Sequence, residues 1–309
     1  MEEKKRLAYL GPAGTFTEQA LYSQPDLVEL ALISTPSILE VLKKVNNKEV
    51  DLGFVAIENS IEGSVNITQD TLAFDAELLI QREVVTSIEM NLLAPKGTQL
   101  KDIKTIVSFP HAIAQCKEWL SKNLPDAVTE AANSTADAAE QVSQKNMAGF
   151  AAIGTKLAAD TYGLELIKVG IEDYSENETR FVLVAPDDVP APTGQDKTSI
   201  VVFQDADRPG SLLSILQEFA ARSLNLTRLE SRPTRQGLGN YCFLIDLKGH
   251  ISDEIVADCL KNLHMKNGSV KFLGSYPSAS ADSDLREKTS VESEKAENWL
   301  DNLRNRIRK

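Results

Sequence analysis

Cysteine and histidine are scarce in this 309-residue sequence, with three of each. Cys116, Cys242 and Cys259 lie far apart and odd in number, so they predict neither a disulfide framework nor a metal cluster. The histidines are equally scattered and offer no metal-binding pair at helical spacing. No nucleotide P-loop is present, because no Gly-Lys-Ser/Thr follows the glycine-rich turn at 11–17. We therefore expect a protein that works without a metal or other cofactor.

Long hydrophobic runs and a basic excess are also missing. Nowhere do about 18 apolar residues follow one another, and the apolar run at 7–10 is too short for a signal peptide. Acidic residues outnumber basic ones by 45 to 33, which gives a net charge of −12. A field of that sign repels phosphate backbones and anionic lipid. We expect a cytoplasmic protein that binds neither nucleic acid nor membrane, although one local Arg or helix N-terminus can hold a small anion.

What is present predicts an α/β fold. Over residues 5–186, short apolar runs alternate with helical patterns, which is typical of α/β architecture with largely parallel sheets. The element count fits two compact lobes with a ligand cleft between them, as in periplasmic binding proteins. The expected strands are 7–10, 28–33, 52–57, 78–85, 91–94, 103–107, 149–153, 164–169 and 181–184, and the expected helices are 17–22, 36–45, 66–73, 111–122, 135–144 and 156–162.

A second, smaller module follows. Residues 186–197 hold three prolines and a glycine with little apolar content, which indicates a linker. Residues 198–277 then read β-α-β-β-α-β, the order of the ferredoxin-like unit. Residues 278–309 are rich in Ser, Asp and Glu, and we expect a tail that is either helical or disordered.

Two polar segments follow strands of the first lobe. Residues 11–17 could let the backbone approach a ligand through their glycines, or form a plain turn capped by Thr15 or Thr17. Residues 58–65 come directly after an apolar strand. They could form a ligand loop, or Asn59 and Ser60 could satisfy backbone groups in a turn.

Two further polar segments have the same double interpretation. In 108–116, Ser108 and Gln115 could face the cleft, or Ser108 could cap a helix with Gln115 in solvent. In 172–181, Arg180 could bind a carboxylate beside the hydroxyl donor Thr179, or form a structural salt bridge.

Taken together and in order, these segments resemble the prephenate dehydratase family. The matching segments are Gly11-Pro12-x-Gly14-Thr15-Phe16-Thr17, Ile57-Glu58-Asn59-Ser60, Pro110 through Ala114-Gln115-Cys116, Ser134-Thr135-Ala136, and Asn177-x-Thr179-Arg180-Phe181. Beyond the linker, residues 209–212 and 225–233 resemble the amino-acid-sensing ACT domain. The two resemblances cover about 270 residues, all but the tail.

The resemblance implies conversion of prephenate to phenylpyruvate, carbon dioxide and water in L-phenylalanine biosynthesis. In that reaction Thr179 would donate a hydrogen bond to the departing hydroxyl, Arg180 would bind a substrate carboxylate, and Glu58 is a candidate proton source. The implied catalytic residues are Thr179, Arg180, Asn59, Ser108 and Gln115, and the implied substrate-binding residues are Thr15, Glu58, Ser60 and Phe181.

The ACT resemblance implies feedback control by L-phenylalanine. ACT domains commonly pair, so we expect a homodimer or homotetramer with the effector at a subunit interface. The implied effector-binding residues are Pro209, Gly210, Ser211, Leu212, Asn225, Glu230, Ser231, Arg232 and Pro233.

The sequence departs from the family at a few positions. Phe109-Pro110-His111 stands where the family usually has His-Pro-Gln, so the resemblance assigns no role to position 109 or 111. Glu172 replaces a frequent Gln, and Ser211 replaces Ala. No chorismate mutase helices precede Leu7, which implies one catalytic function. Two rival functions stay open: arogenate dehydratase, and a catalytically silent ligand-binding sensor.

Overall fold

The computed structural model describes residues 4–145, 148–204, 209–235, 240–267, 269–279 and 299. The chain divides into two compact units, residues 1–189 with 271–274, and residues 190–270 with 275–309. The predicted tail lies outside the described residues, apart from Ser278, Ala279 and Trp299. No helix among the described residues is long and apolar enough to cross a membrane.

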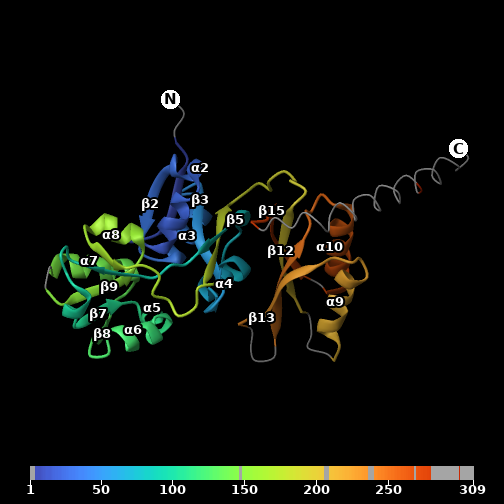
Figure 1. Cartoon of the computed structure of the whole chain (residues 1–309). Coiled ribbons are helices and arrows are strands. Elements are labelled where there is room, and N and C mark those ends of the chain that lie inside the picture. The colour runs from blue at the N-terminus through green and yellow to red at the C-terminus, as the bar shows by residue number, and fades with distance from the viewer. Residues whose placement is uncertain are drawn as a thin grey trace, which may run out of the picture. The chain divides into compact units, whose positions relative to one another are not determined.

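Unit 1 contains two sheets, one for each lobe (Figure 1). The sheet of the first lobe runs in the order β2 (Ala31–Thr35), β1 (Arg6–Leu10), β3 (Leu52–Asn59), β11 (Glu178–Ala185) and β5 (Leu79–Ser87), with β4 (Gly63–Ser64) paired to β3. Its helical segments are α1 (Phe16–Tyr22), α2 (Pro25–Val28), α3 (Ile38–Asn46), α4 (Asn66–Asp70) and the π-helical turn η1 (Thr71–Asp75). Helix α3 shows how the sequence builds this lobe: Ser37 caps its N-terminus, and Val41, Leu42 and Val45 are buried on one face.

The second lobe is inserted between β5 and β11. Its sheet runs in the order β10 (Glu165–Lys168), β6 (Asn91–Ala94), β9 (Phe150–Gly154), β7 (Thr105–Ser108) and β8 (Val128–Ala131). Its helices are η2 (Leu100–Asp102), α5 (Pro110–Gln115), α6 (Lys117–Asn123), α7 (Thr135–Lys145) and α8 (Lys156–Tyr162). Apolar clusters fill this lobe, one of them around Leu93, Val107, Ala138 and Val142.

The chain crosses between the lobes twice, after β5 and after β10, which gives the expected two-lobed α/β domain. The expectation of largely parallel sheets is wrong for the strands next to these crossings. β11 runs antiparallel to both β3 and β5, and β6 runs antiparallel to both β9 and β10. A strand that returns directly from the other lobe enters the sheet from the opposite end, so it cannot lie parallel to the βαβ strands.

The turn at 11–15 joins the lobes. Thr155 Oγ1 donates to the carbonyl of Gly14 at 2.7 Å, and Tyr162 Oη donates to the carbonyl of Ala13 at 2.9 Å. Gly14 has a φ of +88°, and a Cβ there would lie 2.9 Å from the Cα of Ala158 in α8. Gly14 therefore lets this backbone approach the other lobe, whereas one of the two interpretations of the sequence was a close approach to a ligand.

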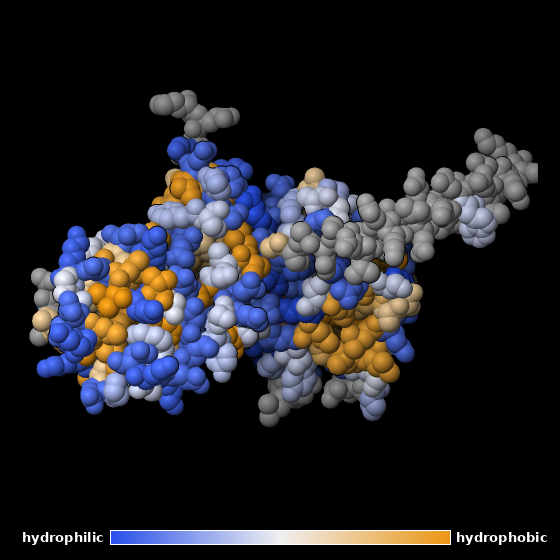
Figure 2. All heavy atoms as spheres, in the orientation of Figure 1, coloured by the Kyte–Doolittle hydropathy of each residue, from blue (hydrophilic) through white to orange (hydrophobic). Residues whose placement is uncertain are grey.

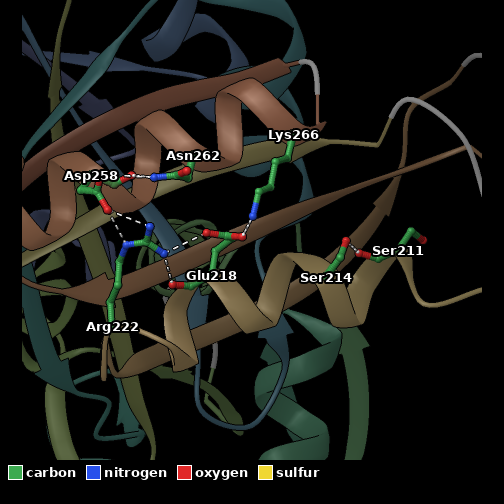
Figure 3. A network of polar contacts seen from close by, with 7 residues as sticks. All are labelled: Ser211, Ser214, Glu218, Arg222, Asp258, Asn262 and Lys266. Atoms are coloured by element: carbon green, nitrogen blue, oxygen red, sulfur yellow. Dashed lines mark hydrogen bonds and ion pairs between the residues drawn. The ribbon is translucent and has the colours of Figure 1, made fainter.

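Unit 2 has the predicted β-α-β-β-α-β order. Its sheet runs β13 (Leu226–Pro233), β14 (Tyr241–Lys248), β12 (Asp196–Phe203) and β15 (Ser269–Pro277), with helices α9 (Ser211–Ala220) and α10 (Glu254–Asn267). Ion pairs join the two helices (Figure 3): Arg222 binds both Glu218 and Asp258, and Lys266 reaches Glu218. The ferredoxin-like fold expected for this module is confirmed.

The Gly14 contact leads to a stability prediction. Gly14→Ala adds both backbone strain and a clash with α8, whereas Gly97→Ala adds strain alone, because Gly97 has a φ of +82° and open space for 4 Å around the place that a Cβ would take. We expect Gly14→Ala to lower the free energy of unfolding by about 1–3 kcal/mol more than Gly97→Ala. Urea denaturation of both variants measures the difference, and equal losses would contradict the contact.

Candidate active site

The pairing of β3 with β11 sets which side chains meet in the cleft. Thr179 lies opposite Asn59, and Arg180 lies opposite Glu58. Successive side chains of a strand point to opposite faces, so the two pairs lie on opposite sides of the sheet. The Thr179 side faces the inserted lobe. On the other side, Arg180 Nε lies 2.6 Å from Glu83 Oε2, and its NH1 lies 3.4 Å from Glu58 Oε2.

Four side chains form a closed ring of hydrogen bonds between the lobes. Asn59 Nδ2 donates to Asn177 Oδ1 at 2.8 Å, and Asn177 Nδ2 donates to Gln115 Oε1 at 2.9 Å. Gln115 Nε2 donates to Glu62 Oε1 at 3.0 Å. The backbone N–H of Glu62 closes the ring by donating to Asn59 Oδ1 at 2.9 Å. Asn177 and Gln115 are 1% and 8% exposed, so this half of the ring is held away from most solvent.

The ring fixes the direction of the hydrogen bond to Thr179. Asn59 Oδ1 accepts from the backbone N–H groups of Ile61 and Glu62, so the other end of the amide must be the donor. Asn59 Nδ2 lies 2.9 Å from Thr179 Oγ1 and donates to it. Because an amide nitrogen does not accept, the Thr179 hydroxyl keeps its own proton for another acceptor.

A second contact across the cleft joins Glu62 to His111. Glu62 Oε2 lies 2.7 Å from His111 Nδ1, and the His111 ring stacks on Phe109 with 5.3 Å between ring centroids. The hydrogen bond from Gln115, and then the pairing with His111, lower the pKa of the Glu62 carboxyl. Glu62 is therefore a carboxylate at neutral pH, with both oxygens engaged on α5.

A cavity of about 320 Å³ opens beside Thr179 and is lined by both lobes. That volume is within the range of small-molecule sites, about 300–1,000 Å³. The polar lining residues are Thr15, Thr17, Asn59, Glu62, His111, Gln115, Asn133, Ser134, Thr135, Asn177 and Thr179. The apolar lining residues are Leu10, Phe16, Ala56, Ile88, Met90, Phe109, Ala112 and Phe181.

The structure brings five of the predicted site residues to this cavity: Thr15, Asn59, Gln115, Phe181 and Thr179. Thr15 also caps α1, since its hydroxyl accepts from the Glu18 N–H at 3.2 Å. The polar face that residues 11–17 were expected to offer is thus partly a cap and partly cavity wall.

The other four predicted residues do not line the cavity. Arg180 and Glu58 pair on the opposite face of the sheet. Ser108 is fully buried and donates to the Ile153 carbonyl at 2.8 Å, while Phe109 takes the cap position of α5. Ser60 accepts from the Glu178 N–H at 2.9 Å and binds the next strand.

Seven polar lining residues were not among the predicted site residues, and three of these, Asn177, Glu62 and His111, form the hydrogen bonds between the lobes described above. Asn177 was part of a matching segment, and its place between Gln115 and Asn59 depends on the crossing after β10. Glu62 lay in the 58–65 segment without a role. His111 was set aside because it departs from the family, yet the structure puts it in the cavity wall. None of these side chains has a local signal that shows which partner it meets across the lobes.

In unit 2 the predicted effector residues lie at two ends of the sheet. Gly210, with a φ of +87°, directly precedes α9, and β12 is the strand before it in the chain. Arg232, Cys242 and Phe203 are paired side by side across β13, β14 and β12, so the 230–233 segment lies at this same end. The carbonyl of Asn225 accepts from the Lys248 N–H at the other end. Strand β13 has eight residues, a rise of roughly 25 Å, and separates the two groups.

The site and the fold define a small-molecule enzyme: a two-lobed α/β domain with an oriented hydroxyl in its cleft, followed by a ferredoxin-like unit. Residues 7–189 match the prephenate dehydratase family model, and residues 198–264 match the ACT domain model. A prephenate dehydratase of Mycobacteroides abscessus is 43% identical over 280 residues, which is 88% of this chain and 90% of the relative.

Two solved structures are similar along most of the chain. Prephenate dehydratase of Arthrobacter aurescens, in complex with L-Phe, aligns with a TM-score of 0.87 at 39% identity, covering 97% of this chain and 99% of its own. A structure described as GqqA, a novel type of quorum quenching acylase, aligns with a TM-score of 0.80 at 27% identity, covering 89% and 98%. The chain belongs to the prephenate dehydratase family, and it is a decarboxylating carbon–oxygen lyase with a C-terminal ACT domain.

The ring leads to a prediction for Asn177. Asn177→Ala leaves Gln115 Oε1 without its donor in a buried position, so we expect a loss of unfolding free energy of about 1–3 kcal/mol. Prephenate turnover should fall at least about tenfold, since Asn59 and Gln115 lose their fixed orientation. Asn123→Ala, at an exposed amide of the same lobe, is the matched control. Full turnover and stability in Asn177→Ala would argue against the ring.

Proposed function

We propose that the cleft converts prephenate to phenylpyruvate, carbon dioxide and water as a step of L-phenylalanine biosynthesis. The ring carboxylate leaves as carbon dioxide, and its bonding electrons move through the ring and expel the hydroxyl on the opposite carbon. One proton joins the departing hydroxide to give water, and the product ring is aromatic. The chemistry asks the protein to hold a dianion and to assist a leaving hydroxyl.

The observation that carries this proposal is the hydrogen bond from Asn59 to Thr179. Since Thr179 Oγ1 accepts from Asn59, its O–H points away from that amide and can donate to the departing oxygen. A preorganised donor of this kind stabilises charge that develops only in the transition state. In this assignment Thr179 is the catalytic donor, and Asn59, Gln115 and Asn177 orient it and the substrate.

The other predicted site residues fall into two groups, those in the cavity wall and those away from it. Phe181 and Thr15 lie in the cavity wall and would contact substrate. Arg180, with Glu58 and Glu83, would hold β11 between β3 and β5, and Ser108 would fasten β7 to β9. We therefore assign positioning roles to Arg180, Glu58, Ser60 and Ser108, and no substrate contact.

Arogenate dehydration is the second candidate, and Glu62 is the observation that favours it. Arogenate carries an ammonium group where prephenate has a ketone, and a carboxylate in the cavity wall would attract that group. Incubation of the purified protein with each substrate in turn, followed by product absorbance, separates the two functions. A silent sensor would turn over neither.

Thr179 gives the direct test of the reaction. Thr179→Val keeps the shape and removes the donor, while Asn59 Nδ2 retains Asn177 Oδ1 and the Glu178 carbonyl as acceptors, so the fold should be kept. We expect kcat to fall about 10²–10³-fold, as for other preorganised donors. Thr179→Ser, which keeps the hydroxyl, should stay within about tenfold of the original kcat. Equal rates for the Val and Ser variants would exclude a donor role.

We further propose that L-phenylalanine binds the ACT domain and inhibits the enzyme. Gly210 would let the backbone close on the amino acid at the start of α9, whose N–H groups suit a carboxylate. Asn225, which was expected to bind the same effector, lies at the far end of β13 in the same chain. A complete site therefore needs a second copy, which supports a homodimer or homotetramer.

The surface of unit 2 supports pairing. Figure 2 shows hydrophobic side chains gathered over α9, where Leu212 and Leu213 are exposed. β13 is an edge strand of its sheet and carries the exposed Leu229. Exposed apolar side chains beside an open strand edge are typical of a protein–protein contact.

Gly210→Val tests the regulation. Its side chain would strain a backbone with a φ of +87° and enter the space in which the effector would lie, so inhibition by phenylalanine should be lost. Gly194→Val is the matched control, because Gly194 has a φ of +83° in the same unit with open space around it. The inhibition curve of each variant is measured together with phenylalanine binding by calorimetry. If Gly210→Val is inhibited at the same phenylalanine concentration as the original protein, Gly210 is not part of the effector site.

A further inference from the structure

The pair formed by Glu62 and His111 has no role in the reaction as assigned above. Glu62 follows β3 of the first lobe, and His111 lies in α5 of the inserted lobe. Their side chains meet at 2.7 Å, and both line the cavity. The pair therefore places the Glu62 carboxylate in the cavity wall and also joins the two lobes.

Glu62 is tied to its place by the hydrogen-bond ring. Gln115 Oε1 accepts from Asn177, so Gln115 Nε2 has to donate, and Glu62 Oε1 is its acceptor. The ring thus holds a carboxylate against a cavity that, on the proposed function, has to admit a dianion. Like charges at that separation repel each other, and partial burial strengthens the repulsion.

His111 is the group that can cancel this charge. It is the only residue capable of bearing a positive charge among those that line the cavity in the described part of the chain. Arg180, the nearest candidate from the sequence, is engaged by Glu83 and Glu58 on the other face of the sheet. A protonated imidazole donates from both nitrogens, so Nδ1 can serve Glu62 while Nε2 remains for a substrate carboxylate.

We propose that the Glu62–His111 pair selects the substrate by charge: the imidazole of His111 balances the Glu62 carboxylate, and the cleft then prefers prephenate to its amino analogue arogenate. Without His111, Glu62 stands as a bare carboxylate that repels the dianion and attracts the ammonium group of arogenate. The inference rests on the proposed function, since it concerns the choice between the two substrates of the same site. Both residues are positioning groups for charge and take no part in bond breaking.

The experiment compares kcat and KM for prephenate and arogenate in the full-length protein and in three variants: His111→Gln, Glu62→Gln and the double variant. In His111→Gln, we expect the ratio of kcat/KM for prephenate to that for arogenate to fall roughly tenfold, mainly through a higher KM for prephenate. Glu62→Gln keeps an acceptor for Gln115 and should not lower the ratio. Where arogenate turnover is too slow to follow, its inhibition constant against prephenate takes its place.

The double variant distinguishes charge from structure. If His111 acts by neutralising Glu62, removing both charges should restore the ratio to within about threefold of the original, although two contacts are lost. A merely structural role predicts that the double variant is at least as impaired as His111→Gln. His264→Gln and Glu29→Gln, at exposed positions of α10 and the end of α2, are the matched controls.

Provided that the original protein turns over prephenate, two results would overturn the assignment of the pair. One is an unchanged ratio of kcat/KM for the two substrates in His111→Gln, and the other is a double variant whose ratio does not recover. Failure of the proposed function is a different result, because the original protein would then turn over neither substrate. Thermal unfolding of every variant checks that the fold is kept, which is expected because both side chains are more than 40% exposed.

Discussion

Both the oxygen and the nitrogen of the Asn59 side-chain amide are hydrogen-bonded, and the geometry of the cleft depends on these bonds. Its oxygen accepts two backbone N–H groups, and its nitrogen shares two protons among Asn177, Glu178 and Thr179. This leaves Thr179 as an acceptor toward the protein and a donor toward the cavity. The same amide anchors the ring that continues through Asn177 and Gln115 into the inserted lobe. A single residue at the end of β3 thereby takes part both in the hydrogen bonds between the lobes and in the orientation of the Thr179 hydroxyl.

Side chains along β11 alternate between the two faces of the sheet, so neighbouring residues of this strand have different surroundings. In β11 the odd positions, Thr179 and Phe181, face the cavity, and Arg180 between them faces the buried Glu83 and the partly exposed Glu58. Arg180 follows Thr179 directly in the sequence, and their side chains therefore lie on opposite faces of the sheet. Arg180 and Glu58 are therefore absent from the cavity lining, where Glu62 and His111 are the ionisable side chains among the described residues.

Much of the fold follows from the sequence, because apolar periodicity reports burial directly. The expected strands at 52–57, 91–94 and 149–153 and the helix at 156–162 coincide with β3, β6, β9 and α8 to within about two residues. Strand β8 was not predicted, because all four of its residues are exposed and it therefore lacks the apolar pattern of a buried strand. The family segments led to Thr179, Asn59 and Gln115. They did not show that Arg180 and Ser108 lie outside the cavity lining. For Arg180, the position depends on strand pairing between residues more than a hundred positions apart.

β11 also determines the order in which the catalytic domain can be completed. The inserted lobe is continuous in sequence, from β6 to β10, and can close its own sheet as soon as it is synthesised. The first lobe has to wait, because β11, which lies between β3 and β5, is the last of its strands to be synthesised. Until then two apolar strand edges lie open, and the loop that must close spans the whole inserted lobe. Thr179 in the cavity wall is thus carried by the strand that completes the first lobe, so the cavity lining is incomplete until β11 has paired.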